Sequence, residues 1–401
     1  MMPADNIDHV FRGSRVLFFI RGGGKGGAEL SLLEILQRMN RNRFLPVLAS
    51  LTEGPVVDEI REMGIETHVL EAPGKLVEAR RQELASPAKI HHSASRFFSS
   101  IRVARQLAGL LRETGCHLLY ANSLKAHVIG SVAGWLAGVP VVWHVRDVLF
   151  HRWERILFRL LRFLFRPTVI ANSRFTAGHL GGGRGIKVIY NGVDLAATKP
   201  GRDAARVREE LGIPPDAPLV GMAGRVQQWK GHEVFLAAAE MLLDDFPDAW
   251  FAIAGGDLYS EEHFLDNLKK GVRGNDKLKN RVVFTGHRKD VLDIINTFDV
   301  YVHPTLKDEP FGRVIMEAMA LGKPVVTTRC GGPEEIVLDE YTGLMVAAGD
   351  AKALSRAVGR LLIDRETAKK FGANGRRRVE EMLPLDKTIW AVEQTLEEAM
   401  R

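Results

Sequence analysis

Short runs of aliphatic and β-branched residues alternate with segments of helical periodicity along most of the chain. This alternation is typical of parallel sheets whose strands are joined by crossover helices. The pattern therefore predicts an α/β protein with two doubly wound sheets. The predicted strands span residues 15–20, 44–50, 67–71, 117–122, 140–145, 168–173 and 187–192 in the first half, and 218–224, 250–256, 281–287, 300–305 and 323–329 in the second.

A domain boundary is predicted near residues 195–217, where prolines and glycines cluster and the charge balance changes. We assign residues 1–195 to an N-terminal domain and residues 196–384 to a C-terminal domain. The last segment, residues 385–401, has a helical pattern. Its periodicity leaves open whether this helix crosses back to the N-terminal domain.

Composition excludes several classes of protein. With 401 residues, 46% of them hydrophobic and 26% charged, the chain is neither a disordered tail nor a fibre. Cys116 and Cys330 lie far apart and outside any CxxC spacing, which excludes a disulfide framework and a zinc site and suits a reducing compartment. No secretory leader is visible, so we expect a cytoplasmic protein.

Residues 126–145 contain no Asp, Glu, Lys or Arg and need to be considered as a membrane span. Two histidines, three glycines and Pro140 interrupt the run. The GVP sequence at 138–140 indicates a helix end followed by a buried strand, so we expect no span here.

Charge is distributed unevenly between the two halves. Residues 1–195 carry 26 Lys and Arg against 16 Asp and Glu, whereas residues 196–401 carry 29 against 33. The basic first half favours an anionic partner. The basic segments lack any known nucleic-acid recognition module, so we expect no nucleic acid among the partners.

A glycine-rich turn follows the first predicted strand and opens a helix. Bare backbone and a helix N-terminus are suited to a phosphate, and Gly22, Gly24 and Gly27 satisfy GxGxxG. Lys25 is followed by Gly26, not by Ser or Thr, which excludes a nucleoside-triphosphate P-loop. An NAD-dependent oxidoreductase stays an alternative, with Glu53 as the acid that would bind the ribose.

Two cations follow the first strand of the second domain. Arg225 ends this strand, and Lys230 lies just before a helix that begins around Gly231. Ligands of open α/β sheets bind beyond the carboxyl ends of the strands, so both cations are candidates for holding a diphosphate. The alternative is two solvated surface charges.

Two carboxylates flank a predicted helix start in LKDEPFGRVIMEAMALGKPVVTT. Glu309 lies in a loop, Gly312 leaves the backbone bare where the helix begins, and Glu317 lies about one and a half turns further on. Carboxylates recognise vicinal hydroxyls of a ribose or a hexose by accepting their hydrogen bonds. The alternative for Glu317 is an i,i+4 pair with Arg313.

Seven motifs occur in order along nearly the whole chain. They are GGAEL at 26–30, WHVRD at 143–147, VIANS at 169–173, VIYNGVD at 188–194, GRVQQWKG at 224–231, the pair Glu309 and Glu317, and GGPEEIV at 331–337. Together they resemble the retaining, nucleotide-sugar-dependent glycosyltransferases of family 4. The resemblance implies the GT-B fold, two Rossmann-like doubly wound domains that face each other across a cleft. The N-terminal domain would then be the acceptor side and the C-terminal domain the nucleotide-sugar side.

The resemblance implies a role for each matching position. Gly26 and Gly27 would pack beside the donor diphosphate, and Arg225 and Lys230 would neutralise it as it leaves. Glu309 would contact the sugar, Glu317 would hold the ribose, and His144 would lie near the sugar on the acceptor side. Backbone N–H groups from Phe311 onward would touch sugar and phosphate, which adds Gly312, Arg313 and Val314 to the donor site. Without the resemblance, His144 would be interpreted as a core histidine at the end of a strand.

The resemblance implies transfer of a hexose from UDP, GDP or another nucleoside diphosphate, without a cofactor. Breaking the glycosidic bond places negative charge on the β-phosphate, which preorganised cations stabilise, so we expect no metal. Asp244 and Asp245 lie late in a helical pattern and are interpreted as a solvated helix end. A nucleotide-sugar epimerase of the same fold stays a second alternative.

Two basic stretches bear on the acceptor. Residues 150–165 have arginines at spacings of three and four opposite a broad apolar face, which suits either a membrane-interface helix or a domain helix with solvated arginines. Residues 78–107 fall where similar enzymes shape the acceptor pocket. The hypothesis is a lipid-linked or otherwise anionic acceptor, with peripheral contact at the inner face of the membrane and a role in glycan biosynthesis.

Overall fold

The computed structural model describes residues 13–22, 24, 26–72, 90–181, 185–256 and 263–401, with no side chains for 90–97. The chain divides into two compact units, Met1–Tyr190 with Asp386–Arg401, and Asn191–Leu385. Lys25 and residues 78–89 of the basic stretch lie outside the described residues, as does Gly23 of the glycine-rich turn.

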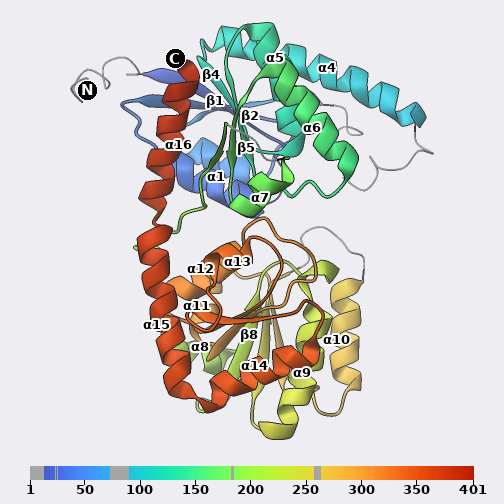
Figure 1. Ribbon diagram of the computed structural model, residues 1–401, viewed down its shortest axis with the longest axis vertical. Coiled ribbons are helices and arrows are strands. Elements are labelled where there is room, and N and C mark those ends of the chain that lie inside the picture. The colour runs from blue at the N-terminus through green and yellow to red at the C-terminus, as the bar shows by residue number, and fades with distance from the viewer. Residues whose placement is uncertain (1–12, 23, 25, 73–89, 182–184, 257–262) are drawn as a thin grey trace. The chain divides into compact units, whose positions relative to one another are not determined.

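Unit 1 contains a seven-stranded parallel sheet in the order β3-β2-β1-β4-β5-β6-β7. The strand order reverses between β1 and β4, so the ends of these two strands flank a topological switch point. Figure 1 shows the sheet between its helices. The strands are β1 (Ser14–Ile20), β2 (Phe44–Ser50), β3 (Glu66–Val69), β4 (Leu118–Ala121), β5 (Val141–Val145), β6 (Thr168–Ala171) and β7 (Ile186–Val188).

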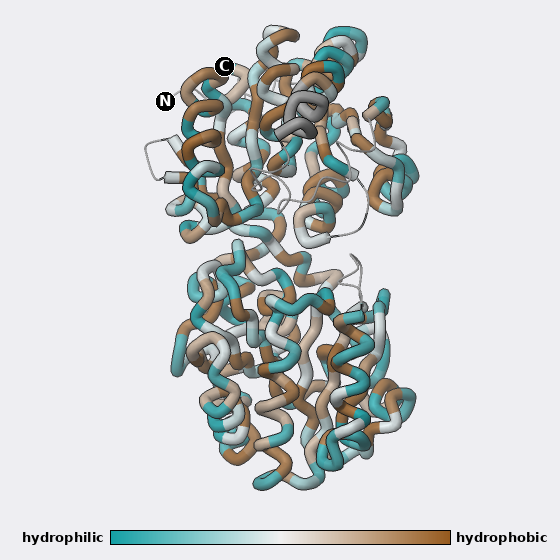
Figure 2. Tube along the Cα trace, turned by 90° about the vertical axis from the view of Figure 1, so that its right-hand side faces the viewer, coloured by the Kyte–Doolittle hydropathy of each residue, from teal (hydrophilic) through white to brown (hydrophobic). Residues whose placement is uncertain are grey.

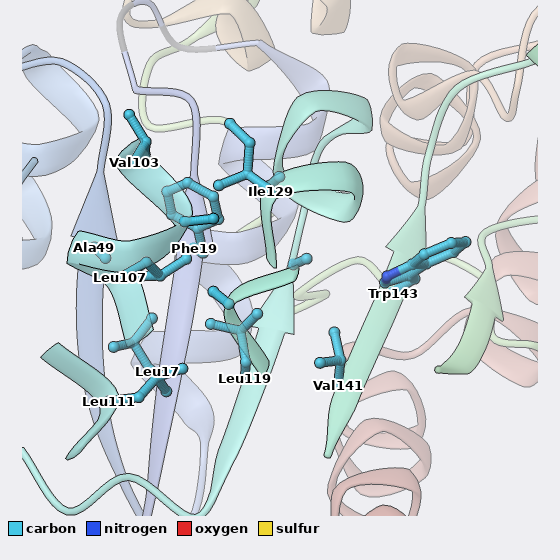
Figure 3. Packing of buried hydrophobic residues seen from close by; sticks show 14 of the residues in the cluster. Leu17, Phe19, Ala49, Val103, Leu107, Leu111, Leu119, Ile129, Val141 and Trp143 are labelled. Carbon is cyan, nitrogen blue, oxygen red and sulfur yellow. The ribbon is translucent and has the colours of Figure 1, made fainter. Parts of the chain in front are cut away.

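Both faces of this sheet are buried, because successive side chains of a strand point to opposite faces. Leu17 and Phe19 of β1 join a core on one face, and Val16 and Phe18 join a second core on the other. Figure 3 shows Phe19 and Trp143 in the first of these cores. Helices α4 (Ile90–Glu113), α5 (Leu124–Ala137) and α6 (Arg152–Phe165) cover that face, and α1 (Gly27–Arg38) and α2 (Pro55–Glu62) cover the other.

The uncharged run at 126–145 folds as a helix and a strand, as expected. Ser123 caps α5 by accepting a hydrogen bond from the N–H of Ala126, and Gly138 ends the helix with φ 74°. Val141 then begins the buried strand β5. Within the part of the chain that the structure describes, no helix is long and apolar enough to cross a membrane.

Unit 2 repeats the architecture with a six-stranded parallel sheet in the order β10-β9-β8-β11-β12-β13. The switch point lies between β8 and β11. One face packs against α9 (His232–Asp245), α10 (Phe264–Gly274), α14 (Ala351–Ile363) and α15 (Arg365–Met382). The strands are β8 (Leu219–Ala223), β9 (Trp250–Ala254), β10 (Val282–Gly286), β11 (Val300–His303), β12 (Val325–Thr328) and β13 (Gly343–Val346).

The two doubly wound sheets confirm the predicted fold class, and the sequence pattern missed one strand, β13. Further helices are α7 (Arg174–His179) in unit 1, and α8 (Ala204–Glu210), α11 (Val291–Asn296), α12 (Arg313–Ala320) and α13 (Pro333–Ile336) in unit 2. Hydrophilic and hydrophobic positions alternate along the helices of both units (Figure 2), as surface helices require.

The final helix, α16 (Leu385–Met400), packs its apolar side into unit 1. Val392 and Leu396 are fully buried in the core that also holds α1 and α2. Glu393 accepts a hydrogen bond from the N–H of Asn40 at 2.7 Å, and Arg43 forms ion pairs with Glu393 and Glu397. The end of the chain is thereby fixed to the first sheet.

Candidate active site

Two chain segments leave the switch point of unit 2, at the carboxyl ends of β8 and β11. The first runs from Gly224 through a short 3-10 helix, η4 (Gln228–Lys230), into α9. The second runs from Pro304 to Gly312 and leads into α12. In open α/β sheets this position is the usual site for a ligand.

The two segments contact each other closely. The N–H of Leu306 donates to the carbonyl of Trp229 at 2.8 Å, and the Thr305 hydroxyl donates to the same carbonyl at 3.2 Å. Gly231 has φ 76°, and a Cβ there would lie 1.9 Å from the carbonyl oxygen of Pro304. Only glycine fits this approach, which fixes the neighbouring Lys230 against the second segment.

Lys230, Glu309 and His303 form a hydrogen-bonded cluster. Nζ of Lys230 lies 2.7 Å from Oε1 of Glu309, and Nε2 of His303 lies 2.6 Å from Oε2. Glu309 and His303 are 8% and 3% exposed. The ammonium also lies 4.3 Å from the centre of the Trp229 ring, in cation–π range. Both carboxylate oxygens are therefore held in place.

The neighbours of Glu309 keep its carboxylate ionised. Burial alone would raise the pKa of Glu309, but the nearby Lys230 and His303 hold it well below its usual range. Burial lowers the pKa of Lys230, and Arg225 lowers it further, while Glu309 opposes both effects. Arg225 thus adds a second positive charge close to Lys230, which makes the edge of the site attractive to an anion.

The GGPEEIV motif positions the loop that carries Glu309. The N–H of Glu309 donates to the carbonyl of Cys330 at 3.1 Å, and the N–H of Gly332 donates to the carbonyl of Glu309 at 2.8 Å. A Cβ on Gly332 would lie 2.4 Å from the carbonyl oxygen of Pro310. The bare glycine is what allows the two backbones to approach.

Helix α12 points its N-terminus toward the same region. Gly312 caps it with φ 105°, and Phe311 just before it is buried. Arg313 and Val314 form the first turn, whose backbone N–H groups carry positive partial charge. Glu317 follows on α12, and its Oε1 lies 3.4 Å from Nη2 of Arg313. The i,i+4 pair with Arg313 is therefore present.

The glycine-rich turn of unit 1 ends at α1. Gly22 has φ 81°, Gly26 is the N-cap of α1 and Gly27 is its first residue. The carboxylate of Glu29 accepts a hydrogen bond from the N–H of Gly26 at 3.2 Å. Glu53 is exposed and pairs with Arg61 at 3.2 Å.

His144 lies at the other side of the switch point of unit 1, buried near the end of β5. Its Nδ1 is hydrogen-bonded to the hydroxyl of Tyr120 and lies 3.3 Å from Nη2 of Arg146. Arg146 also donates from Nε to Oδ1 of Asn122 at 3.0 Å, and Asn122 donates to the carbonyl of Ala28 at 3.1 Å. This network links His144 to the helix that begins at Gly27.

The partners of His144 decide its protonation. Burial lowers its pKa well below the usual value, and the charge of Arg146 lowers it further, so the ring is neutral. A guanidinium can only donate, so Nδ1 is the acceptor and the proton is on Nε2. Among the described residues, this buried Nε2 has no hydrogen-bond partner.

The structure brings Lys230 and Glu309 into contact and places Arg225, Phe311, Gly312 and Glu317 on the surrounding segments of unit 2. Gly26, Gly27 and His144 belong to unit 1. Sequence reasoning missed His303, Tyr120, Asn122 and Arg146. These four residues lie at or just beyond the carboxyl ends of β11, β4 and β5. Their polar side chains at strand ends were the signal from which they could have been predicted.

Other acidic residues are placed away from this chemistry. Asp244, in the last turn of α9, pairs with Lys277 and is exposed, in agreement with a solvated helix end. Among the residues that the structure describes, no group of three or more His, Cys, Asp or Glu is arranged to hold a metal ion.

Comparison with known proteins decides the family. Residues 203–378 match the family model of glycosyl transferases group 1, and residues 25–197 match that of glycosyltransferase family 4. The lipopolysaccharide core mannosyltransferase LpsB of Rhizobium meliloti is 32% identical over 251 residues, which are 62% of this chain and 69% of that protein. The chain belongs to glycosyltransferase family 4.

Other relatives of this family 4 chain cover it to different extents. A galactosyltransferase of Escherichia coli, named for UDP-Gal and GlcNAc-diphosphoundecaprenol, is 26% identical over 64% of this chain and 69% of its own length. The crystal structure of HepE from Anabaena with UDP-glucose has a TM-score of 0.81 and 25% identity, covering 96% of this chain and 99% of that one. The GT-B fold expected for the family is therefore confirmed.

Proposed function

We propose that this family 4 protein transfers a hexose from a nucleoside-diphosphate sugar to a hydroxyl acceptor, with retention at the anomeric carbon. The observation that carries the proposal is the Lys230–Glu309–His303 cluster at the switch point of unit 2. The names of its relatives support a nucleotide-sugar donor, because HepE is described with UDP-glucose and the E. coli relative uses UDP-Gal.

The diphosphate of the donor would bind Arg225 and Lys230. Lys230 uses one of its three N–H donors on Glu309 and keeps its ammonium at a fixed position. The backbone N–H groups from Phe311 to Val314, at the start of α12, would add donors, and the family resemblance also assigns Gly26 and Gly27 of unit 1 to the diphosphate. Glu317 would accept hydrogen bonds from the ribose hydroxyls.

The family resemblance assigns contacts with the sugar to Glu309 in unit 2 and to His144 in unit 1, and the chemistry of each residue fits that role. The Glu309 carboxylate, held ionised by its neighbours, would accept hydrogen bonds from the hexose and stabilise positive charge on the ring. The Nε2–H of His144 is a buried donor, suited to a sugar hydroxyl. Both groups are preorganised by their own hydrogen bonds, so little reorganisation is needed when substrate binds.

The reaction would proceed by heterolysis of the bond between the anomeric carbon and the β-phosphate oxygen. The bonding electrons leave with the nucleoside diphosphate, whose charge Arg225 and Lys230 neutralise without a metal. The acceptor hydroxyl attacks from the face that the leaving group vacates, and its proton passes to the departing phosphate oxygen. Attack on that face retains the configuration.

The acceptor we propose is a lipid-linked precursor of a cell-surface glycan. Support comes from the basic character of residues 1–195 and from relatives named for lipopolysaccharide core and undecaprenol-linked substrates. An anionic diphosphate lipid would be attracted by the positive field of this half. The cytoplasmic localisation expected from the sequence stays a prediction.

A panel of UDP-, GDP-, ADP- and TDP-sugars tests the function. We expect wild-type protein to release nucleoside diphosphate from at least one donor and to lose this activity in Glu309→Gln, with the fold intact by circular dichroism. Recovery of an isomerised donor instead of free sugar would indicate an epimerase. Binding of NADH with no response to any donor would indicate an oxidoreductase.

A further inference from the structure

Helix α6 exposes large apolar side chains to solvent over its full length. Six of them are 39% to 76% exposed, although a buried position would be expected for such residues. The sequence FHRWERILFRLLRFLF left open whether this side faces a protein core, and the structure shows that it does not. The six residues are Trp153, Ile156, Leu157, Leu160, Phe163 and Leu164.

These exposed residues form one continuous stripe. At about 100° per residue, the six positions fall within an arc of about 120°. The four arginines of the helix, residues 152, 155, 159 and 162, fall within an arc of about 80° along one border of the stripe. We refer to the six residues as the apolar face of α6 and to the four arginines as its basic edge.

The third side of α6 fixes the helix to the domain. Phe158 is buried against Trp143 of β5, with ring centres 4.8 Å apart. Glu154, also buried, accepts a hydrogen bond from the N–H of His151 at 3.1 Å and so satisfies the start of the helix. The inner side of α6 therefore packs against the domain, and the apolar face lies on the side of the helix that is exposed to solvent.

The charged residues of α6 indicate what kind of partner fits its apolar face. Glu154, the one carboxylate of α6, is buried on the inner side, so α6 itself adds no acid to the surface beside its arginines. A symmetric contact with a second copy would offer this edge no acidic match on α6. A phospholipid surface matches both features of the helix. Its acyl chains can contact the apolar face, and its anionic phosphates can bind the arginines.

We propose that α6 is a docking helix that lies in the interface of an anionic phospholipid membrane. The apolar face enters the boundary between headgroups and acyl chains, and the basic edge binds headgroup phosphates. The contact would concentrate the protein on the surface where a lipid-linked acceptor resides. The proposal goes beyond glycosyl transfer and does not require it.

The test is co-sedimentation of the full chain with vesicles, without any nucleotide sugar. We expect binding to phosphatidylcholine vesicles that contain about a quarter phosphatidylglycerol, and weaker binding to pure phosphatidylcholine or at high salt. Ile156→Glu with Phe163→Glu should lower the partition coefficient about tenfold or more, because two apolar anchors become anions. Arg152→Gln with Arg155→Gln should reduce binding to the anionic vesicles selectively.

Ile363, at the end of α14, provides a matched control. Its side chain is 76% exposed, like those of the apolar face, but it belongs to another helix, far from α6 in the sequence. Ile363→Glu should bind vesicles like wild type, and all variants should melt at the wild-type temperature. The proposal is overturned if wild-type protein fails to sediment with anionic vesicles, or if Ile363→Glu weakens binding equally. It is also overturned if the protein is a dimer in solution that the α6 variant dissociates.

Because this assay contains no donor, its failure leaves the proposed glycosyl transfer untouched. Conversely, a protein that binds vesicles but releases no nucleoside diphosphate would contradict the transferase and not the docking helix.

Discussion

At the scale of single residues, Arg146 has the clearest indirect role. It does not belong to the motif positions assigned to the donor, yet it fixes the acceptor role of Nδ1 in His144 and connects this ring to Asn122. Orienting groups of this kind act through the residue they hold. Arg146 is therefore a positioning residue.

Replacing Arg146 by Met should lower kcat for donor hydrolysis by about 10- to 100-fold, because the ring of His144 loses its fixed tautomer. The KM for the donor should change by less than about threefold. The pKa of His144 should rise, because the positive charge beside it is removed. Imidazole nitrogen shifts in NMR spectra measure this change, and the exposed Arg356→Met is the control. An unchanged imidazole spectrum would exclude the positioning role.

Sequence reasoning assigned Lys230 and Glu309 to the same donor site but did not predict that their side chains contact each other. Seventy-nine positions separate them, and only the parallel order of β8 and β11 places their loops side by side. His303 was missed because a histidine inside a predicted strand reads as part of the core. The loop at residues 304–309 brings Glu309 back to His303. The path of this loop cannot be predicted from the periodicity of the sequence.

At the scale of elements, the glycines after the strands control the site. Gly231 combines a positive φ with a backbone contact to Pro304, and Gly332 makes a similar approach to Pro310. The sequence analysis interpreted Gly231 as the start of a helix and Gly332 only as part of the GGPEEIV motif. The structure shows them as points where two backbones touch.

Gly231→Ala tests this reading. An added Cβ would lie 1.9 Å from the Pro304 carbonyl oxygen, so the two segments must separate. We expect a loss of stability of about 3 kcal/mol or more, together with loss of donor hydrolysis. Thermal melting and initial rates measure the two effects.

Gly212→Ala is the matched control, because Gly212 has φ 69° and no atom within 4 Å of an added Cβ. It should cost only the conformational strain of about 1 to 2 kcal/mol and keep full activity. Equal losses in both variants would show that strain, and not the contact with Pro304, limits position 231.

The missed strand β13 belongs to the same scale. It has four residues, Gly343–Val346, and lies at the edge of the sheet beside β12. Alternation over four residues that begin with glycine carries little information about a strand. The long, apolar central strands could be predicted because both of their faces are buried.

At the scale of the whole molecule, buried histidines make stability depend on pH. Burial lowers the pKa of His127 and of His232 to about 4, and that of His144 well below its usual value of 6.5. Below about pH 6.5 these histidines become protonated in the unfolded chain. In the folded chain His127 and His232 stay neutral until about pH 4. Stability must therefore fall as pH decreases through this window.

We expect each such histidine to lower the free energy of unfolding by up to about 1.4 kcal/mol per pH unit in that window. Chemical denaturation at several pH values between about 7 and 5 measures the slope. His232→Gln should make the slope shallower, because it removes one of the buried rings whose pKa is lowered. A slope that is the same in wild type and His232→Gln would contradict the burial of that ring in its neutral form.

The arrangement of two doubly wound sheets was predictable, since strand and helix periodicities repeat along both halves. The division of the chain shows what periodicity could not determine. Residues Asp386–Arg401 belong to the first unit, through Val392, Leu396 and the ion pairs of Arg43. Such a return depends on contacts between residues about 350 positions apart, which no local pattern encodes.

The proposed glycosyl transfer depends on binding of the donor diphosphate at the edge of unit 2 formed by Arg225 and Lys230. Titration calorimetry with the nucleoside diphosphate of the preferred donor tests it most directly, using wild type, Lys230→Ala, and the exposed Lys270→Ala as control. We expect saturable binding that weakens at least about tenfold in Lys230→Ala, equivalent to about 1.4 kcal/mol, and is unchanged in Lys270→Ala. Equal affinity of wild type and Lys230→Ala would contradict it.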